Sequence, residues 1–386
     1  MIATMTGRER IKAALTGQAV DRPPLNLGSS FHLHTGLPDD TFLWGWTREQ
    51  RFLELREYAR PWCDSYCGFE PPLFNRYMMV SAHRISTETI QVSPALRTIK
   101  GRISLPGGDA CFEDHQTAGF ATDWHIITPA SDRIILDHMI QAPFEVDESA
   151  LEQTVRMFRK LEADLGEHGY PQLFLPSPAV AISHGMHLED FLVLCLEEPD
   201  TVHDYCKEIT RRISLCIEAL FSRIKPDCAF VFGGSEQFTP PLMRPDSFDE
   251  FVVPYESTLV KQLKCYGVPL DCHCHGRVAH AIHKIMEMGY DATNPVEPPP
   301  QGDLSIQDAR RIVGDRLTLI GNIEFVELEH GEPHEIRKQV REIIATGKQR
   351  LIMTDAALQL RQAVTERMDL NYRAWIDEYR LATTEA

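Results

Sequence analysis

The stretch Val268–Gly276 concentrates side chains that bind metals and transfer protons. It reads Val-Pro-Leu-Asp-Cys-His-Cys-His-Gly, so histidines, cysteines and an aspartate follow a short apolar run. Because side chains alternate across a strand, His273 and His275 are predicted to share one face. Cys272 and Cys274 then lie on the opposite face, where small thiols commonly pack in a core.

This pattern leaves two kinds of chemistry open. Imidazole nitrogens two positions apart could bind zinc, and Glu236, which follows another apolar run, could complete a three-ligand catalytic site with His273 and His275. Without a metal, the same histidines could act as acid–base groups or hydrogen-bond an anionic substrate. Cys274 as a thiolate ligand also stays open, if the strand ends before it.

Polar side chains follow other apolar runs as well. In a parallel barrel these positions line the active site, because the carboxyl ends of the strands meet there. Arg277 could bind a carboxylate with its forked guanidinium group. The predicted substrate-binding residues are Arg277, Asn294, Glu297 and Asn322.

The elements that must position these residues alternate between short apolar strands and longer helices. This alternation predicts an α/β fold with a parallel sheet, and the number of units favours a closed (β/α)8 TIM barrel. Strands are expected over 21–28, 173–182, 228–232, 268–272, 292–296, 317–320 and 351–353. Helices are expected over 6–17, 149–166, 188–224 with a break near 198–199, 247–266, 278–288, 306–313 and 335–346.

The segment from about 90 to 127 has a different pattern. Polar and apolar residues alternate in short runs around Pro106-Gly-Gly108, which predicts inserted β-hairpins. Residues 1–60 are expected to decorate the barrel with N-terminal helices. No linker-like stretch divides the chain, so 1–386 is predicted to form a single domain.

Composition excludes several classes of function. Hydrophobic residues make up 43% and charged residues 25%, and no apolar run is long enough to span a membrane. The net charge of −17 and the absence of a basic cluster argue against nucleic-acid binding. The first residues lack an apolar signal region, and the ten cysteines show no disulfide spacing. We therefore expect a cytoplasmic protein.

Several segments resemble the uroporphyrinogen decarboxylase superfamily. They are Arg8–Pro24, His184–Leu192, Gly289–Pro295 and Gly314–Ile323. The resemblance implies a (β/α)8 barrel. It also implies one of two activities: metal-free decarboxylation in the porphyrin pathway, or transfer of a methyl group between a corrinoid protein and a thiol or other acceptor, for which many members use zinc.

The motifs of both branches are altered in this chain. The decarboxylases carry Arg-Gln-Ala-Gly-Arg after the first strand, whereas Asn26–His34 contains no arginine. The His-x-Cys-Gly motif of the zinc methyltransferases falls on His273, His275 and Gly276, so a histidine replaces the cysteine. Their later ligand cysteine would fall near Thr354–Ala357, which contains none.

The resemblance therefore implies a methyltransferase acting on a small molecule. It would be metal-dependent through His273, His275 and Glu236, with a corrinoid carried by a partner protein. The alternatives are a metal-free decarboxylase or lyase of a small carboxylate or porphyrinogen-like substrate, and a non-catalytic ligand-binding barrel. The oligomeric state is left open.

Overall fold

A parallel sheet forms the centre of the protein, seen in a computed structural model that describes residues 5–356 and 363–384. In the described part of the chain, seven strands follow the order β1-β6-β7-β8-β9-β10-β11, and every neighbouring pair is parallel. The strands are β1 (Ser65–Phe69), β6 (Gly169–Pro176), β7 (Ala229–Gly233), β8 (Leu270–His273), β9 (Ala292–Asn294), β10 (Thr318–Ile323) and β11 (Leu351–Asp355).

A short extended segment closes the sheet into a barrel. Leu25 forms a parallel bridge with Met353 of β11, and its carbonyl accepts a hydrogen bond from the Asp64 N–H at 2.7 Å, next to β1. Residues 24–26 thus occupy the eighth position, which confirms the predicted (β/α)8 barrel. The longer strand predicted over 21–28 is absent, because Pro23 and Pro24 have no N–H to donate to a ladder.

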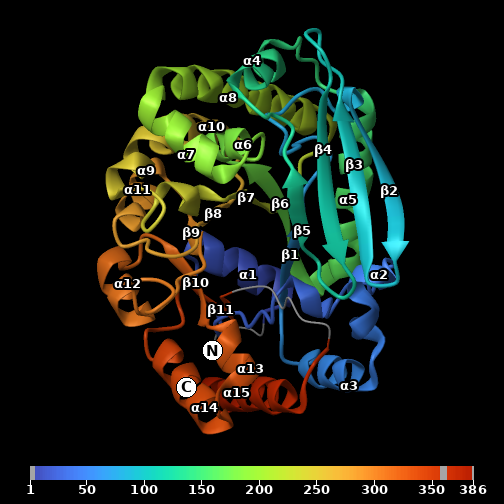
Figure 1. Cartoon of the computed structure of the whole chain (residues 1–386). Helices are drawn as coiled ribbons and strands as arrows, with labels where there is room; N and C mark the ends of the chain where they lie inside the picture. Colours follow the sequence, from blue (N-terminus) through green and yellow to red (C-terminus); the bar gives the residue numbers. More distant parts are fainter. Residues whose placement is uncertain (1–4, 357–362, 385–386) are drawn as a thin grey trace.

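Helices surround the barrel in chain order, as Figure 1 shows. The apolar cluster between strands and helices includes outward side chains such as Leu173, Phe230 and Leu319. The α-helices are α1 (Gly7–Thr16), α2 (Thr41–Trp44), α3 (Gln50–Ala59), α4 (Arg133–Gln141), α5 (Glu148–Leu165), α6 (Pro178–Ser183), α7 (Leu188–Glu197), α8 (Pro199–Arg223), α9 (Pro245–Phe251), α10 (Val253–Cys265), α11 (Ala281–Met288), α12 (Ile306–Val313), α13 (Phe325–His330), α14 (Pro333–Ile344) and α15 (Glu366–Thr384). None of these helices, in the part of the chain described, is long and apolar enough to cross a membrane.

Helix α1 covers the amino ends of the strands. Thr6 and Glu9 form a capping box at its start, and Gly17 ends it in a left-handed conformation. Its apolar face, including Ile11 and Leu15, packs against inward side chains of the strands in a second, smaller apolar cluster. The active-site end of the barrel must therefore be the opposite, carboxyl end.

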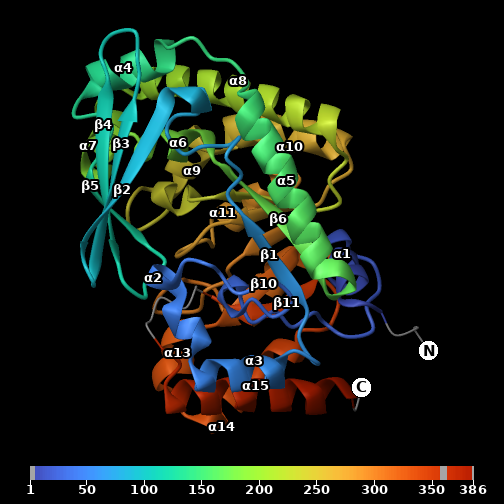
Figure 2. The same cartoon turned by 90° about the vertical axis from the view of Figure 1, so that its right-hand side faces the viewer.

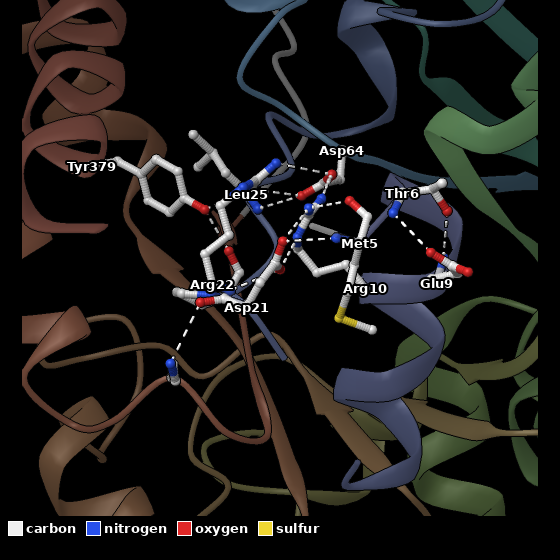
Figure 3. Close-up of polar contacts among 11 residues, drawn as sticks. Met5, Thr6, Glu9, Arg10, Asp21, Arg22, Leu25, Asp64 and Tyr379 are labelled. Carbon is white, nitrogen blue, oxygen red and sulfur yellow. Dashed lines mark hydrogen bonds and ion pairs between the residues drawn. The ribbon is translucent and has the colours of Figure 1, made fainter. Parts of the chain in front are cut away.

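A buried ionic cluster fixes the amino end of the barrel (Figure 3). Arg10 of α1 donates to Asp21 at 2.7 Å and to Asp64 at 2.6 Å, and Arg22 also pairs with Asp64 at 3.0 Å. The Tyr379 hydroxyl of α15 accepts a hydrogen bond from Arg22 at 2.6 Å. Charged groups taken out of water need such mutual pairing, and here it joins α1, the closing segment, β1 and α15.

The segment for which hairpins are predicted forms an antiparallel sheet. Within the described residues it has four strands in the order β2-β3-β4-β5, namely β2 (Ile85–Ser93), β3 (Leu96–Ile103), β4 (Ala110–Thr117) and β5 (Asp123–Ile127). One face packs inward through Phe112, whose ring stacks on Tyr77 at 4.5 Å. In Figure 2 this sheet and α1 lie on opposite sides of the barrel, so the sheet stands toward its carboxyl end.

Two predicted elements differ in the structure. The strand expected over 173–182 ends at Pro176, and α6 begins at Pro178, a residue suited to the first turn of a helix. The helix expected over 247–266 is divided at Val252, and a second helix, α10, begins at Val253 with Pro254 in its first turn. Both differences arise at prolines, which restrict the preceding residue.

Candidate active site at the carboxyl ends of the strands

Strand register places the predicted residues at one end of the barrel. Gly233 of β7 lies opposite His273 of β8, which in turn lies opposite Asn294 of β9. Asp271, two residues before His273, faces the same side, one level deeper, between Val231 and Ala292. Since Ala292 belongs to the inner apolar cluster, this side is the barrel interior.

His273 is a neutral imidazole in this setting. Burial, together with the nearby His275, lowers the pKa of His273 to about 3. Its ring centroid lies 4.7 Å from that of His275 in an edge-to-face arrangement. His273 Nδ1 is buried and has no hydrogen-bond partner among the described residues. The structure therefore brings the two predicted histidines together.

His275 and Glu297 form a hydrogen-bonded pair across the ends of β8 and β9. His275 Nδ1 lies 2.9 Å from Glu297 Oε1, and Glu297 Oε2 accepts a hydrogen bond from the Gly276 N–H. Burial by itself lowers the pKa of His275, but the hydrogen bond and charge of Glu297 outweigh it and raise the pKa. Burial favours protonation of Glu297, yet the same contacts hold its pKa below the ordinary value. This pair can hold and exchange a proton.

A second carboxylate, Glu324, lies near this pair. It occupies the N-cap position of α13, but its side chain makes no capping hydrogen bond, and Oε1 is buried without a partner. Burial, followed by the charges of Glu297 and Glu327, raises the pKa of Glu324 to about 7. Glu324 is absent from the predicted site residues, although its place just after an apolar strand was a usable signal.

Asp271 lies deeper in the barrel. Its Oδ2 accepts a hydrogen bond from the Tyr66 hydroxyl at 3.3 Å, while Oδ1 is buried without a partner. Burial raises the pKa of Asp271 to about 7, although hydrogen bonds from Tyr66 and Asn294 oppose the shift. Asp355 of β11 is similar, since burial raises its pKa to about 7 as well. Neither residue was among the predicted site residues.

Glu236 and the two cysteines bear on the metal prediction. Glu236 lies just after β7, and its Oε2 is buried without a partner. Burial, followed by the charge of Glu236, raises the pKa of the Cys274 thiol, which disfavours the thiolate that a metal ligand requires. In the described part of the chain, no three His, Cys, Asp or Glu side chains form a group that could hold a metal ion.

The remaining predicted residues differ in their placement. Asn294 contacts Asp271, and Asn322 is buried on β10, in register with Thr354. Thr354 lies on β11, whereas Ala357, at the end of the segment compared with the family cysteine, lies outside the described residues. Arg277 is exposed, precedes α11 by four positions, and pairs with no acidic residue that the structure describes.

Comparison with known proteins finds similarity among solved structures. No curated protein sequence matches it. Among solved structures, a methyltransferase from Methanosarcina mazei is similar with a TM-score of 0.64 and 14% identity, covering 98% of this chain and 99% of that protein. At this identity the likeness concerns the fold. A glycoside hydrolase family 5 cellulase from a Bacteroidetes-affiliated source covers 62% of this chain and 77% of its own, with 10% identity and a TM-score of only 0.38.

A match in sequence identifies the family of this chain. The model of the family described as "Uroporphyrinogen decarboxylase (URO-D)" matches residues 138–356, more than half of the chain. The matched part runs from α4 to the end of β11 and includes each strand end at which the buried acids and histidines meet. The chain thus belongs to the uroporphyrinogen decarboxylase family.

Proposed function

We propose that this protein is a methyltransferase acting on a small molecule, with the His275–Glu297 pair accepting the proton of the methyl acceptor. The observation that carries the proposal is this pair, placed at the carboxyl end of the barrel and reaching solvent through a side chain of His275 that is 33% exposed. The name of the similar Methanosarcina mazei structure, a methyltransferase, supports the same reaction class.

Methyl transfer at this site would begin with removal of a proton from the acceptor. The acceptor loses its S–H or N–H proton to the His275–Glu297 pair, which makes its heteroatom a nucleophile. That heteroatom forms a bond to the methyl carbon, and the donor leaves with the electron pair of the bond that breaks. Asn294 and Asn322, which extend from β9 and β10, would orient the substrate by hydrogen bonds.

The acidic character of the site favours methyl transfer over decarboxylation. Glu236, Glu297 and Glu324 form no ion pair with any lysine or arginine in the described residues. A substrate with several carboxylates would meet like charges there, and such repulsion costs binding free energy. Arg277 remains the candidate anchor for the alternative, a decarboxylase or lyase of a small carboxylate.

The zinc and corrinoid predictions remain proposals. Zinc bound by His273, His275 and Glu236 would lower the pKa of an acceptor thiol or polarise the methyl donor. The unpartnered atoms of His273 and Glu236 suit such a role, but the three side chains do not form a ligand group as they lie. The proposed proton and methyl transfers therefore do not depend on the metal. The corrinoid would be carried by a partner protein.

The proposed activity can be tested with a methylcorrinoid as donor and small thiols and amines as acceptors. Mass spectrometry would detect the methylated product, and we expect His275→Gln and Glu297→Gln each to slow its formation by at least about tenfold. Release of CO2 from small carboxylates without any methylated product would instead establish the decarboxylase. Ligand binding without turnover of either kind would establish the non-catalytic barrel.

A further inference from the structure

Unpartnered acceptor atoms gather at the carboxyl end of the barrel. Three carboxylate oxygens, Glu236 Oε2, Asp271 Oδ1 and Glu324 Oε1, are buried without a hydrogen-bond partner among the described residues. Asp271 is fully buried and Glu324 is only 7% exposed. Leaving a buried acceptor without a donor is unfavourable, so groups of this kind ordinarily meet a donor from a ligand or water.

These side chains also have no lysine or arginine partner among the described residues. Glu297 is hydrogen-bonded to His275, but Glu324 and Glu236 have no charged partner of opposite sign within hydrogen-bond distance in the described chain. The Glu324 side chain makes no hydrogen bond to the N–H groups of α13, and its charge contributes to the raised pKa of His275. A ligand that brings both positive charge and N–H or C–H donors would satisfy the oxygens and the charge together.

Open space lies at the inward face of Gly233, at the same end of the barrel. Gly233 faces inward between Pro176 of β6 and His273 of β8, and a methyl group built on it would meet nothing closer than His273 Cδ2 at 3.9 Å. Phe174 faces the same side two residues before Pro176, is half-buried, and packs in neither apolar cluster. An aromatic face of this kind attracts organic cations.

The acids that the structure describes lack the close grouping that a bare metal ion requires. The described residues contain no group of three ligands that could hold a metal, although several carboxylates lie at the same end of the barrel. An ammonium ion with methyl groups spreads its charge over a wider surface, and it would fill the space in front of Gly233. A small carboxylate offers neither the charge nor the donors.

We propose that the substrate bound at this end of the barrel is a small organic ammonium ion, held beside Gly233 with its charge toward Glu236 and Glu324. This assignment rests on the proposed methyltransferase function for its context, and it names the class of molecule that donates or accepts the methyl group. A quaternary ammonium ion would be a donor. A protonated amine would be an acceptor, giving up its proton before the methyl group arrives.

The test compares charge at constant shape. Choline and its neutral carbon analogue 3,3-dimethylbutan-1-ol would be titrated into the full-length protein by calorimetry, with 3,3-dimethylbutanoate as the anionic probe and propylammonium as the protonated amine. We expect choline or propylammonium to bind at least about tenfold more tightly than the neutral and anionic probes. Tighter binding of choline would favour a quaternary ammonium ligand, and tighter binding of propylammonium would favour a protonated amine.

Two variants locate the site. Glu324→Gln should weaken binding of the cation by about tenfold and leave binding of the neutral analogue unchanged. Gly233→Leu should abolish binding, because its side chain would enter the open space, while Gly45→Leu, at a second glycine with open space around it, should bind as the wild type does. Gly233→Ala serves the same purpose if the leucine variant does not fold.

The outcomes separate this proposal from the proposed function. Equal affinity for choline and its neutral analogue, tighter binding of the carboxylate, or no binding of either cation at millimolar concentrations would overturn the cation assignment, whatever the methyl-transfer assay shows. Cation binding that depends on Glu324 and Gly233 would uphold it even if no methyl transfer were detected, and the methyltransferase function alone would then fail.

Discussion

His275 Nδ1 lies 2.9 Å from Glu297 Oε1, although the two residues are 22 positions apart in the sequence. The contact exists because β8 and β9 are neighbours and both residues follow the ends of their strands. Glu297 also accepts the N–H of Gly276, so one carboxylate fixes both the ring and the backbone that carries it. Of the two imidazole nitrogens, Nδ1 is therefore the one that faces Glu297.

The variant Glu297→Gln should lower the pKa of His275. Burial alone favours the neutral ring, and the charge and hydrogen bond of Glu297 are what raise the pKa above its ordinary value. Histidine titration by NMR, with the His275 signal assigned through His275→Gln, would measure the change. Because the folded-state pKa is raised, the pair stabilises the fold at pH values below the ordinary pKa of histidine, and this contribution is lost as the pH rises through the folded-state pKa.

A surface pair provides the matched control for that titration. His280 Nε2 lies 2.9 Å from Asp249 Oδ1, and both side chains are partly exposed. Asp249→Asn should leave the His275 signal where it is in the wild type. An unchanged His275 pKa in Glu297→Gln would show that the hydrogen bond is not formed in solution.

The zinc prediction calls for metal analysis of protein purified without a histidine tag. If His273, His275 and Glu236 bind zinc, we expect one zinc per chain in the wild type and a large loss in His273→Ala. Chelation should then reduce activity. Protein without stoichiometric metal, and with the same activity before and after chelation, would rule out the zinc-dependent form of the proposal.

Removal of Arg10 should destabilise the fold strongly. Arg10 is the shared partner of Asp21 and Asp64, and the Asp64 side chain is only 3% exposed. Arg10→Met leaves that carboxylate in the protein interior with fewer charged partners, and losses of about 3 kcal/mol are typical of such changes. Chemical denaturation would measure the loss. Arg156→Met, which removes an exposed pair with Glu152, should have little effect, and equal effects of the two variants would contradict the prediction.

Asp21 should make the protein sensitive to acid. Burial favours its protonated form, but hydrogen bonds from Arg10 and from the N–H groups of Met5 and Arg22 lower the pKa of Asp21 from 3.8 to about 2. A depressed pKa stabilises the fold above pH 3.8, and this stabilisation is lost as the pH falls from there toward 2. Asp21→Asn should be less stable than the wild type at pH 5, with a difference that shrinks at pH 3. A constant difference across this range would count against the role of the carboxylate.

The fold was predictable where apolar runs are long and regular. The helix over 306–313 has the bounds observed for α12, and the strands β7 to β11 lie within a few residues of their predicted positions. Strand β1 is not predicted, since Ser65-Tyr-Cys-Gly-Phe is short and contains a glycine. Tertiary pairing with β6, rather than local pattern, makes it a strand.

The site was predictable to the level of strand ends but not of contacts. Alternation correctly separates the inward His273 from Cys272 and Cys274, which lie in the outer apolar cluster. Strand alternation does not predict the contact between Glu297 and His275, because that contact depends on the path of the chain after each strand has ended. Glu324 also follows the end of an apolar strand, but the sequence alone does not show that its side chain lies near His275 and Glu297.

The closing segment of the barrel has a consequence for the order in which the chain can fold. Asn26 and Thr354 share a hydrogen bond across 328 residues, and Leu25 forms its bridge with Met353 of β11. During synthesis, residues 24–26 can therefore meet the start of β1 early, but they cannot close the barrel against β11 until nearly the whole chain has left the ribosome. The newly made chain must carry an open-edged sheet for most of that time, which makes the exposed edge of the last strand made a natural site for chaperone binding or for pairing between chains.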